Sequence, residues 1–230
     1  MIQKDERTAR ERFVDGLSGF LQRHRIPIAV LAVAIVVGIA AFAIFAEVSG
    51  RQAEQALVQL EAVQERLDGR QGLSAEEQSQ LDEELLLELN EITSSYPRTY
   101  AAQRSWFIIG IIHMDNERFA EAAQSFAQTA DRFPDSHLAL IARANEATAH
   151  EELGDFEAAL NAYRRLLDAR SGSNALTARA LFSLGRLTET ALDDAEAARE
   201  YYERVVQEFP QSNWTSLARN RLLALATVAP

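Results

Sequence analysis

Small and apolar residues in the second half of the chain follow a helical spacing that repeats about every 37 to 39 positions. Each copy contains an alanine and, four positions later, an aromatic residue, so both lie on one face of a helix. These pairs are Ala122 with Phe126, Ala159 with Tyr163, and Ala198 with Tyr202. Self-similarity at this period is typical of a solenoid of helical hairpins.

Two further features complete each hairpin. A small residue in the preceding helix lets the two helices approach closely; these residues are Gly110, Ala147 and Gly185. Aromatic–proline steps then end the second helix, because proline has no backbone N–H and biases its predecessor away from helix. These steps are Tyr96-Pro97, Phe133-Pro134 and Phe209-Pro210. The pattern predicts antiparallel helix pairs that need neighbours to bury their apolar faces.

Helices are predicted on both sides of the repeats as well. Glu47–Asp68 carries an apolar stripe, and Ser74–Thr93 begins with a capping-box spacing and resembles the second helix of a degenerate earlier hairpin. The acidic run Asp82-Glu83-Glu84 is predicted to be the solvated face of that helix. Trp214–Val228 is predicted to be an unpaired capping helix, which lets a solenoid end in water.

The residues Trp106, Gly110, Ala122, Phe126 and Pro134 resemble the tetratricopeptide repeat, a helix–turn–helix unit of about 34 residues. The resemblance covers roughly residues 101–210, and its second and third copies are partial. The positions where the family usually has tyrosine hold His113, His150 and Thr188. The resemblance implies a non-enzymatic surface that holds other proteins.

In this family, ligands are usually held by exposed residues of each first helix. Carried over by spacing, this protein-binding groove consists of Arg104, Phe107, Ile111, Met114, Ala144, Thr148, Glu151, Arg179, Phe182, Arg186 and Glu189. Apolar side chains beside arginines suit an extended segment, since guanidinium groups can fork onto a carboxylate. The alternative is that Phe107, Ile111 and Phe182 are buried against neighbouring helices or against the helix Glu47–Asp68.

Residues 26–46 form an uncharged stretch rich in alanine, valine and isoleucine. At about 1.5 Å per residue, one helix of this length spans the roughly 30 Å hydrocarbon core of a bilayer. The segment before it is basic and the segment after it has one arginine, so the positive-inside bias places the N-terminus in the cytoplasm. The competing interpretation is a cleaved signal peptide, because Ala41-Phe42-Ala43 resembles a cleavage site. Ala34 and Gly38 would permit close helix approach in the membrane, which leaves a homo-oligomer open.

Charge and residue types narrow the function further. From Glu47 onward the chain has 17 basic and 30 acidic residues, a net charge of −13 that disfavours nucleic acid as a partner. The absence of cysteine excludes disulfide and thiolate chemistry. His113 and His150 occupy equivalent repeat positions, and we expect both to fill space between helices. No catalytic, cofactor-binding or metal-binding residues are predicted.

The predicted organisation is a basic amphipathic leader (1–25), a transmembrane helix (26–46), a helical linker with a degenerate first hairpin (47–98) and repeats with a capping helix (99–230). The predicted fold class is all-α. This plan resembles the bacterial ancillary SecYEG translocon subunits, which implies an inner-membrane anchor, a periplasmic C-terminal domain, and translocon components, envelope chaperones or exported chains as partners. The motifs Phe133-Pro134-Asp135-Ser136 and Gly154-Asp155-Phe156 equally resemble periplasmic cell-division coordinators and outer-membrane assembly proteins.

Overall fold

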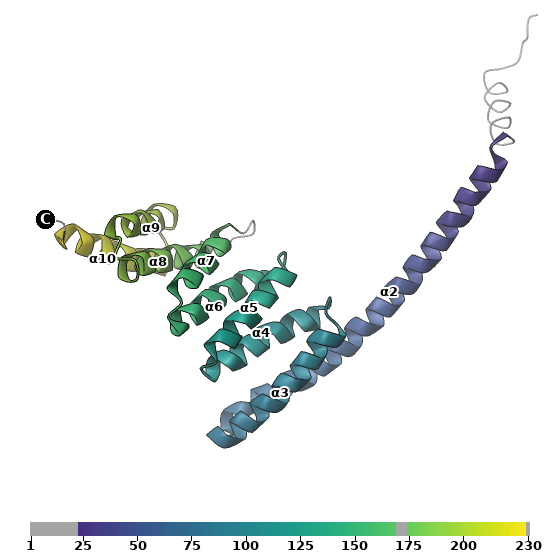
Figure 1. Cartoon of the computed structure of the whole chain (residues 1–230), viewed down its shortest axis with the longest axis horizontal. Coiled ribbons are helices and arrows are strands. Elements are labelled where there is room, and N and C mark those ends of the chain that lie inside the picture. Colours follow the sequence, from purple (N-terminus) through teal and green to yellow (C-terminus); the bar gives the residue numbers. More distant parts are fainter. Residues whose placement is uncertain (1–22, 169–173, 229–230) are drawn as a thin grey trace, which may run out of the picture. The chain divides into compact units, whose positions relative to one another are not determined.

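The computed structural model of the chain describes residues 23–168 and 174–228, in which all regular structure is helical (Figure 1). The elements are α2 (Arg25–Asp68), η1 (Gly69–Gly72), α3 (Ala75–Ser95), α4 (Tyr100–Asp115), α5 (Phe119–Arg132), α6 (His137–Leu153), α7 (Phe156–Leu167), α8 (Asn174–Thr190), α9 (Ala195–Glu208) and α10 (Asn213–Val228). The predicted all-α fold is confirmed. The chain divides into two compact units, Met1–Gln52 and Ala53–Pro230. Most of the predicted leader, residues 1–22, lies outside the described residues.

The second unit is a row of helical hairpins. From α3 to α10, each helix contacts the next one along the chain. The first helices of neighbouring hairpins also contact each other: α4 with α6, α6 with α8, and α8 with α10. Neighbours approach most closely on the inner side of a curved solenoid. Therefore α4, α6 and α8 line the inner side, and α5, α7 and α9 lie outside.

The turns between hairpins repeat one design. Tyr96, Phe133 and Phe209 end α3, α5 and α9, and each lies directly before a proline. Three positions further on, a hydroxyl residue donates its N–H to the aromatic residue's carbonyl and accepts a hydrogen bond from the start of the next helix. These residues are Thr99, Ser136 and Ser212. The aromatic–proline–hydroxyl sequence therefore both stops one helix and starts the next.

The turns inside the hairpins also repeat. Each has one residue with positive φ immediately before the second helix's N-cap: Glu117 (56°), Gly154 (77°) and Asp193 (54°). Glycine adopts this left-handed conformation without steric cost, whereas other residues are strained there by about 1–2 kcal/mol. Asp155 and Asp194 then cap the following helices by accepting a backbone N–H.

Close packing within the hairpins explains the small residues of the first helices. A Cβ atom built on Gly110 would lie 2.6 Å from the Phe126 ring, and one built on Gly185 would lie 2.8 Å from the Tyr202 ring. Both rings are fully buried. The repeating glycine–aromatic pairs therefore set the separation of α4 from α5 and of α8 from α9.

The C-terminal half of α2 and α3 form an additional hairpin before the repeats. Ala56, Leu60 and Val63 of α2 share one buried cluster with residues of α3 and α4. The α3 side of that cluster consists of Leu85, Leu86, Leu89 and Ile92. The predicted capping box is present, because Ser74 and Glu77 exchange side-chain and backbone hydrogen bonds.

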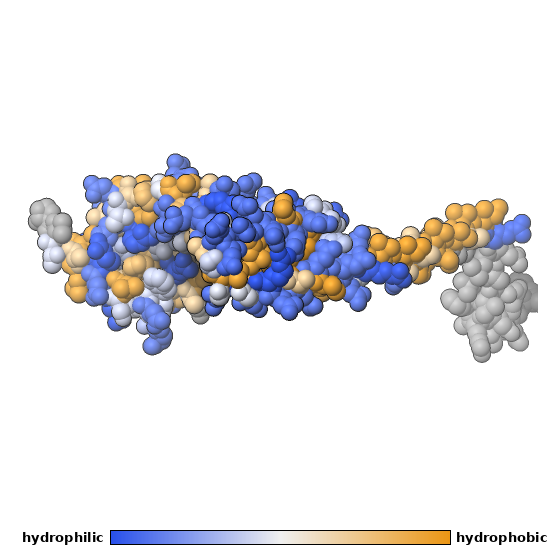
Figure 2. Space-filling model, turned by 90° about the horizontal axis from the view of Figure 1, so that it is seen from below, coloured by the Kyte–Doolittle hydropathy of each residue, from blue (hydrophilic) through white to orange (hydrophobic). Residues whose placement is uncertain are grey.

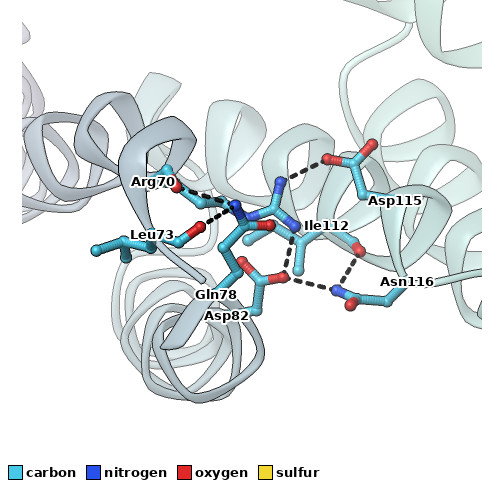
Figure 3. A network of polar contacts seen from close by, with 7 residues as sticks. All are labelled: Arg70, Leu73, Gln78, Asp82, Ile112, Asp115 and Asn116. Atoms are coloured by element: carbon cyan, nitrogen blue, oxygen red, sulfur yellow. Dashed lines mark hydrogen bonds and ion pairs between the residues drawn. The ribbon is translucent and has the colours of Figure 1, made fainter. Parts of the chain in front are cut away.

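A buried ionic network joins this hairpin to α4 (Figure 3). Asp82 is 1% exposed and accepts hydrogen bonds from Arg70 (2.7 Å) and Asn116 (2.8 Å), and Arg70 also contacts Asp115 (2.9 Å). The prediction that the run Asp82-Glu83-Glu84 faces water is therefore wrong for Asp82, although both glutamates are exposed. Asp82 precedes Leu85 by one helical turn and so lies on the buried side of α3.

The last helix, α10, packs on both α8 and α9. Its Trp214 ring lies 5.2 Å from the Phe182 ring, and its Thr215 hydroxyl donates to the Phe209 carbonyl at 2.5 Å. These contacts give α10 the predicted place of a cap on the last hairpin.

In the first unit, the N-terminal part of α2 is apolar and exposed. The large apolar side chains that the structure describes between Ile26 and Phe45 are 54–71% exposed. Figure 2 shows this apolar stretch of the helix in orange. Within the described residues, α2 is the one helix that is long and apolar enough to cross a membrane, a test that a signal sequence also passes.

Candidate protein-binding site

The eleven predicted groove residues all lie on α4, α6 and α8, the inner helices of the solenoid. Nine of them are partly exposed. The other two are buried: Ala144 is 1% exposed and Phe182 is 9% exposed. Phe182 packs on the rings of Tyr202 and Trp214. Ala144 and Phe182 therefore support the surface from beneath.

Apart from Arg104, the part of this surface on α4 is apolar. Phe107, Ile111 and Met114 are partly buried against the cluster that contains Phe126. The rings of Phe107 and Phe126 meet edge to face, with their centroids 5.5 Å apart. These three side chains thus pack on α5 with one side and present the other to solvent.

The part on α6 and α8 is ionic. Glu151 of α6 accepts a hydrogen bond from the Tyr163 hydroxyl (2.8 Å) and pairs with Arg186 of α8. One hairpin further along, Glu189 accepts from the Tyr202 hydroxyl (2.8 Å) and pairs with Arg221 of α10. The same tyrosine–glutamate–arginine arrangement therefore occurs twice along the inner face.

Within each arrangement the arginine side chain is more exposed to solvent than the glutamate side chain. The Arg186 side chain is 40% exposed and that of Glu151 is 16% exposed. Arg221 and Glu189 show the same relation, at 43% and 12%. Each guanidinium has five N–H donors, and these pairs use only some of them. In addition, Arg179 donates to the Thr148 hydroxyl at 2.9 Å. The surface offered to a ligand is consequently rich in donors.

Glu189 is held ionised by its partners. Burial by itself would raise the pKa of Glu189, but hydrogen bonds from Arg221 and Tyr202 outweigh burial and lower that pKa. The pKa of the Tyr202 hydroxyl is raised by burial and by its bond to Glu189, so the phenol stays protonated and acts as a donor.

The first hairpin differs at the equivalent positions. Met114 precedes Glu151 by 37 positions, and Phe126 precedes Tyr163 by the same number. The glutamate–tyrosine hydrogen bond of the later hairpins is therefore replaced by an apolar contact. As a result, the inner face changes from apolar on α4 to ionic on α6 and α8.

The sequence reasoning missed Arg221 and the roles of the two tyrosine hydroxyls. Arg221 lies in the capping helix, which was expected only to cover the last hairpin. The recurrence of Glu151 and Tyr163 as Glu189 and Tyr202 could have indicated a third partner on the next helix.

The histidines offer no assembled metal site. Burial, with Arg118 nearby, lowers the pKa of His113 and keeps its ring neutral. The Nδ1 atom of His150 lies 3.9 Å from an Asp155 oxygen, which is longer than a hydrogen bond. Across residues 23–168 and 174–228, no group of three or more histidine, cysteine, aspartate or glutamate side chains could hold a metal ion.

Comparison with known proteins agrees with this architecture. The family model of the tetratricopeptide repeat matches residues 86–137, 109–145 and 144–213. The chain is also 30% identical, over 161 residues, to a TPR repeat-containing protein of Treponema pallidum (strain Nichols). That match covers 70% of this chain and 65% of the relative, so the chain spans slightly less than two thirds of the relative's length. On its helical hairpins and on these matches, the chain belongs to the tetratricopeptide repeat family.

Proposed function

We propose that this protein is a non-enzymatic, membrane-anchored scaffold that holds an extended segment of another protein on its inner face. The observation that carries the proposal is the inner side of the row, where apolar side chains of α4 are followed by half-exposed guanidinium groups of α8 and α10. Tetratricopeptide repeats are typically protein-binding scaffolds. Apolar contacts would supply affinity, and the arginine N–H donors would bind backbone carbonyls or carboxylates of the segment.

The apolar part of α2 is the proposed anchor. Its basic leader would stay in the cytoplasm by the positive-inside bias, and the repeats would lie on the far side of a bacterial inner membrane. An anchor confines a weak binding surface near a membrane machine and so raises its effective concentration for the clients of that machine. Export of proteins is the process that fits best, because the plan of leader, anchor and acidic repeats resembles the ancillary translocon subunits.

The second candidate is an oligomeric scaffold in cell-envelope division or outer-membrane assembly. This candidate is favoured by two small residues of α2, Ala34 and Gly38, which lie one helical turn apart. No other atom lies within 4 Å of the position that a Cβ atom on Gly38 would take. Such small residues allow two membrane helices to pack closely. Mass measurement in detergent, with and without residues 1–46, distinguishes self-assembly from client binding.

Site-specific photo-crosslinking tests the inner face. A photoreactive residue at Phe107, Ile111 or Arg186 is expected to capture an envelope protein or a chain in transit. The matched control is Glu203, which is exposed on the outer helix α9 and should capture neither. Absence of crosslinks from all three inner positions would contradict the proposed groove.

Protease added outside spheroplasts should digest the repeats and spare the leader.

A further inference from the structure

A second surface feature has a lining that shares no residue with the predicted groove. It is a hollow of about 710 Å³ between α3, α4 and α5, and we call it the Trp106 hollow. Its lining includes Trp106 of α4, Arg132 of α5, and Asn90, Glu91, Thr93 and Ser94 of α3. The tetratricopeptide pattern explains Trp106 as a packing residue, but it does not account for this combination of groups.

The aromatic wall of the hollow already carries a cation. The guanidinium carbon of Arg132 lies 5.8 Å from the centre of the Trp106 ring, within the range of a cation–π contact. Trp106 itself is partly buried against the α2–α3–α4 cluster, which fixes the ring in place. Arg132 is exposed, and its Nε donates to Gln128 at 2.5 Å. The Arg132 contact thus shows that the exposed side of the Trp106 ring accommodates a guanidinium group.

The rim of the hollow presents acceptors. The Asn90 amide donates to the Leu86 carbonyl, the Thr93 hydroxyl to the Asn90 carbonyl, and the Ser94 hydroxyl to the Glu91 carbonyl. These three side chains direct their donors to the backbone, so the lone pairs of their oxygens remain for a ligand. The Glu91 carboxylate adds a full negative charge, and within the described residues it has no ion pair.

The helix leading to the hollow is acidic. Along α3, Leu87 and Glu83 are exposed one and two turns before Glu91, and Leu87 is 75% exposed. Arg66 pairs with Glu84 and Glu88, whereas Glu83 has no ion pair in the described part of the chain. The net charge of −13 from Glu47 onward adds a long-range attraction for cations.

We propose that the Trp106 hollow binds an arginine side chain from a basic segment of a partner protein. The incoming guanidinium takes the place of Arg132 on the Trp106 ring and donates to Glu91 and the neighbouring oxygens. An apolar side chain of the same segment covers Leu87. Trp214 differs from Trp106, because it lines a separate hollow with Glu208 and its ring lies 5.2 Å from the Phe182 ring.

The test uses the full chain in detergent with Trp214→Phe, which leaves Trp106 as its fluorophore, since the chain has two tryptophans. The probes are a capped hexapeptide of alternating arginine and alanine, and its glutamate counterpart. The arginine peptide should change Trp106 fluorescence, and the glutamate peptide should not. Calorimetric titration of the unmodified chain checks that the Trp214→Phe substitution has not created the effect.

Two variants with opposite expected effects make the test specific. Arg132→Gln removes the internal competitor and should tighten binding of the arginine peptide about three- to tenfold, whereas Glu91→Gln should weaken it by a similar factor. Glu203→Gln, on the exposed face of α9, removes the same charge elsewhere and should leave affinity within twofold. Weaker or unchanged binding in Arg132→Gln, or equal binding of both peptides, overturns the proposal. Because the inner face is unaltered in these variants, failure here leaves the proposed scaffold function untouched.

Discussion

At the scale of single residues, the glycines of the first helices are the most constrained positions in the hairpins. Gly110→Ala would place a Cβ atom 2.6 Å from the Phe126 ring, which is fully buried. Such overpacking should lower the free energy of unfolding by about 1–3 kcal/mol, measured by urea denaturation. Gly72→Ala is the control, because nothing lies within 4 Å of its Cβ position, and it should change stability little.

The double variant Gly110→Ala with Phe126→Leu separates overlap from other causes. A smaller side chain opposite the new methyl group should recover part of the loss, since the clash is with the Phe126 ring itself. If the two substitutions were simply additive, steric overlap would not be the reason for glycine at this position.

Asp82 is the residue where sequence reasoning and the fold disagree most. Asp82→Ala leaves Arg70, whose side chain is 19% exposed, without its buried carboxylate, and should cost about 3 kcal/mol. Urea denaturation measures this cost, and hydrogen exchange should show the loss of protection first in α3 and the end of α4. Glu83→Ala removes a neighbouring exposed carboxylate and should stay within about 0.5 kcal/mol. An equal effect of both substitutions would show that the network in Figure 3 contributes nothing.

At the scale of helices, the tyrosine–glutamate–arginine arrangements join one hairpin to the next. Glu189 binds Tyr202 of its own hairpin and Arg221 of α10, so it links α8, α9 and α10. Since the folded-state pKa of Glu189 is lowered, its stabilising contribution is complete above the unfolded pKa of about 4.3. That contribution is lost as the pH falls through the lower folded-state pKa.

This sign gives a pH-dependent prediction. At pH 7, Glu189→Gln should unfold at lower urea concentration than the unmodified chain, by about 1–2 kcal/mol, because Arg221 loses its ionised partner. As the pH falls below about 4 toward the lowered folded-state pKa, the difference should shrink, because the carboxylate of the unmodified chain becomes protonated first in the unfolded and then in the folded state. Glu203→Gln, which alters an exposed charge, should show no such convergence. A difference that stays constant from pH 7 to pH 3 would contradict the assigned role of the carboxylate.

The helices themselves could be predicted from the sequence because their signals are local. The aromatic–proline steps, the capping box of Ser74 and the small residues opposite Phe126 and Tyr202 each act within one hairpin. The ionic contacts could not be predicted in the same way. Arg221 reaches Glu189 across 32 positions, and Asn116 reaches Asp82 across 34, so each pair depends on how whole hairpins stack. The Trp106 hollow likewise forms only where α3, α4 and α5 meet.

At the scale of the whole molecule, two compact units carry different chemistry. Residues 53–230 have their own buried clusters, and the exposed apolar stretch of α2 belongs to the other unit. Removing residues 1–46 should therefore leave the helical content and the unfolding transition of the repeats intact. Circular dichroism measures both of these properties. The truncation should, however, move the protein from the membrane to the soluble fraction, as measured by fractionation.

Loss of the anchor should also reduce capture of clients, because a tethered surface works at an effective concentration that can raise overall binding about 10²- to 10⁴-fold.

Replacing residues 26–46 with an unrelated membrane helix discriminates between the two proposed functions. If the anchor is only a tether, the replacement restores capture fully, and detergent mass measurements show the same species as before. If Ala34 and Gly38 bring copies together, the replacement keeps the protein in the membrane but lowers its assembled mass. Retained capture by the soluble form at native levels would contradict the need for an anchor in either function.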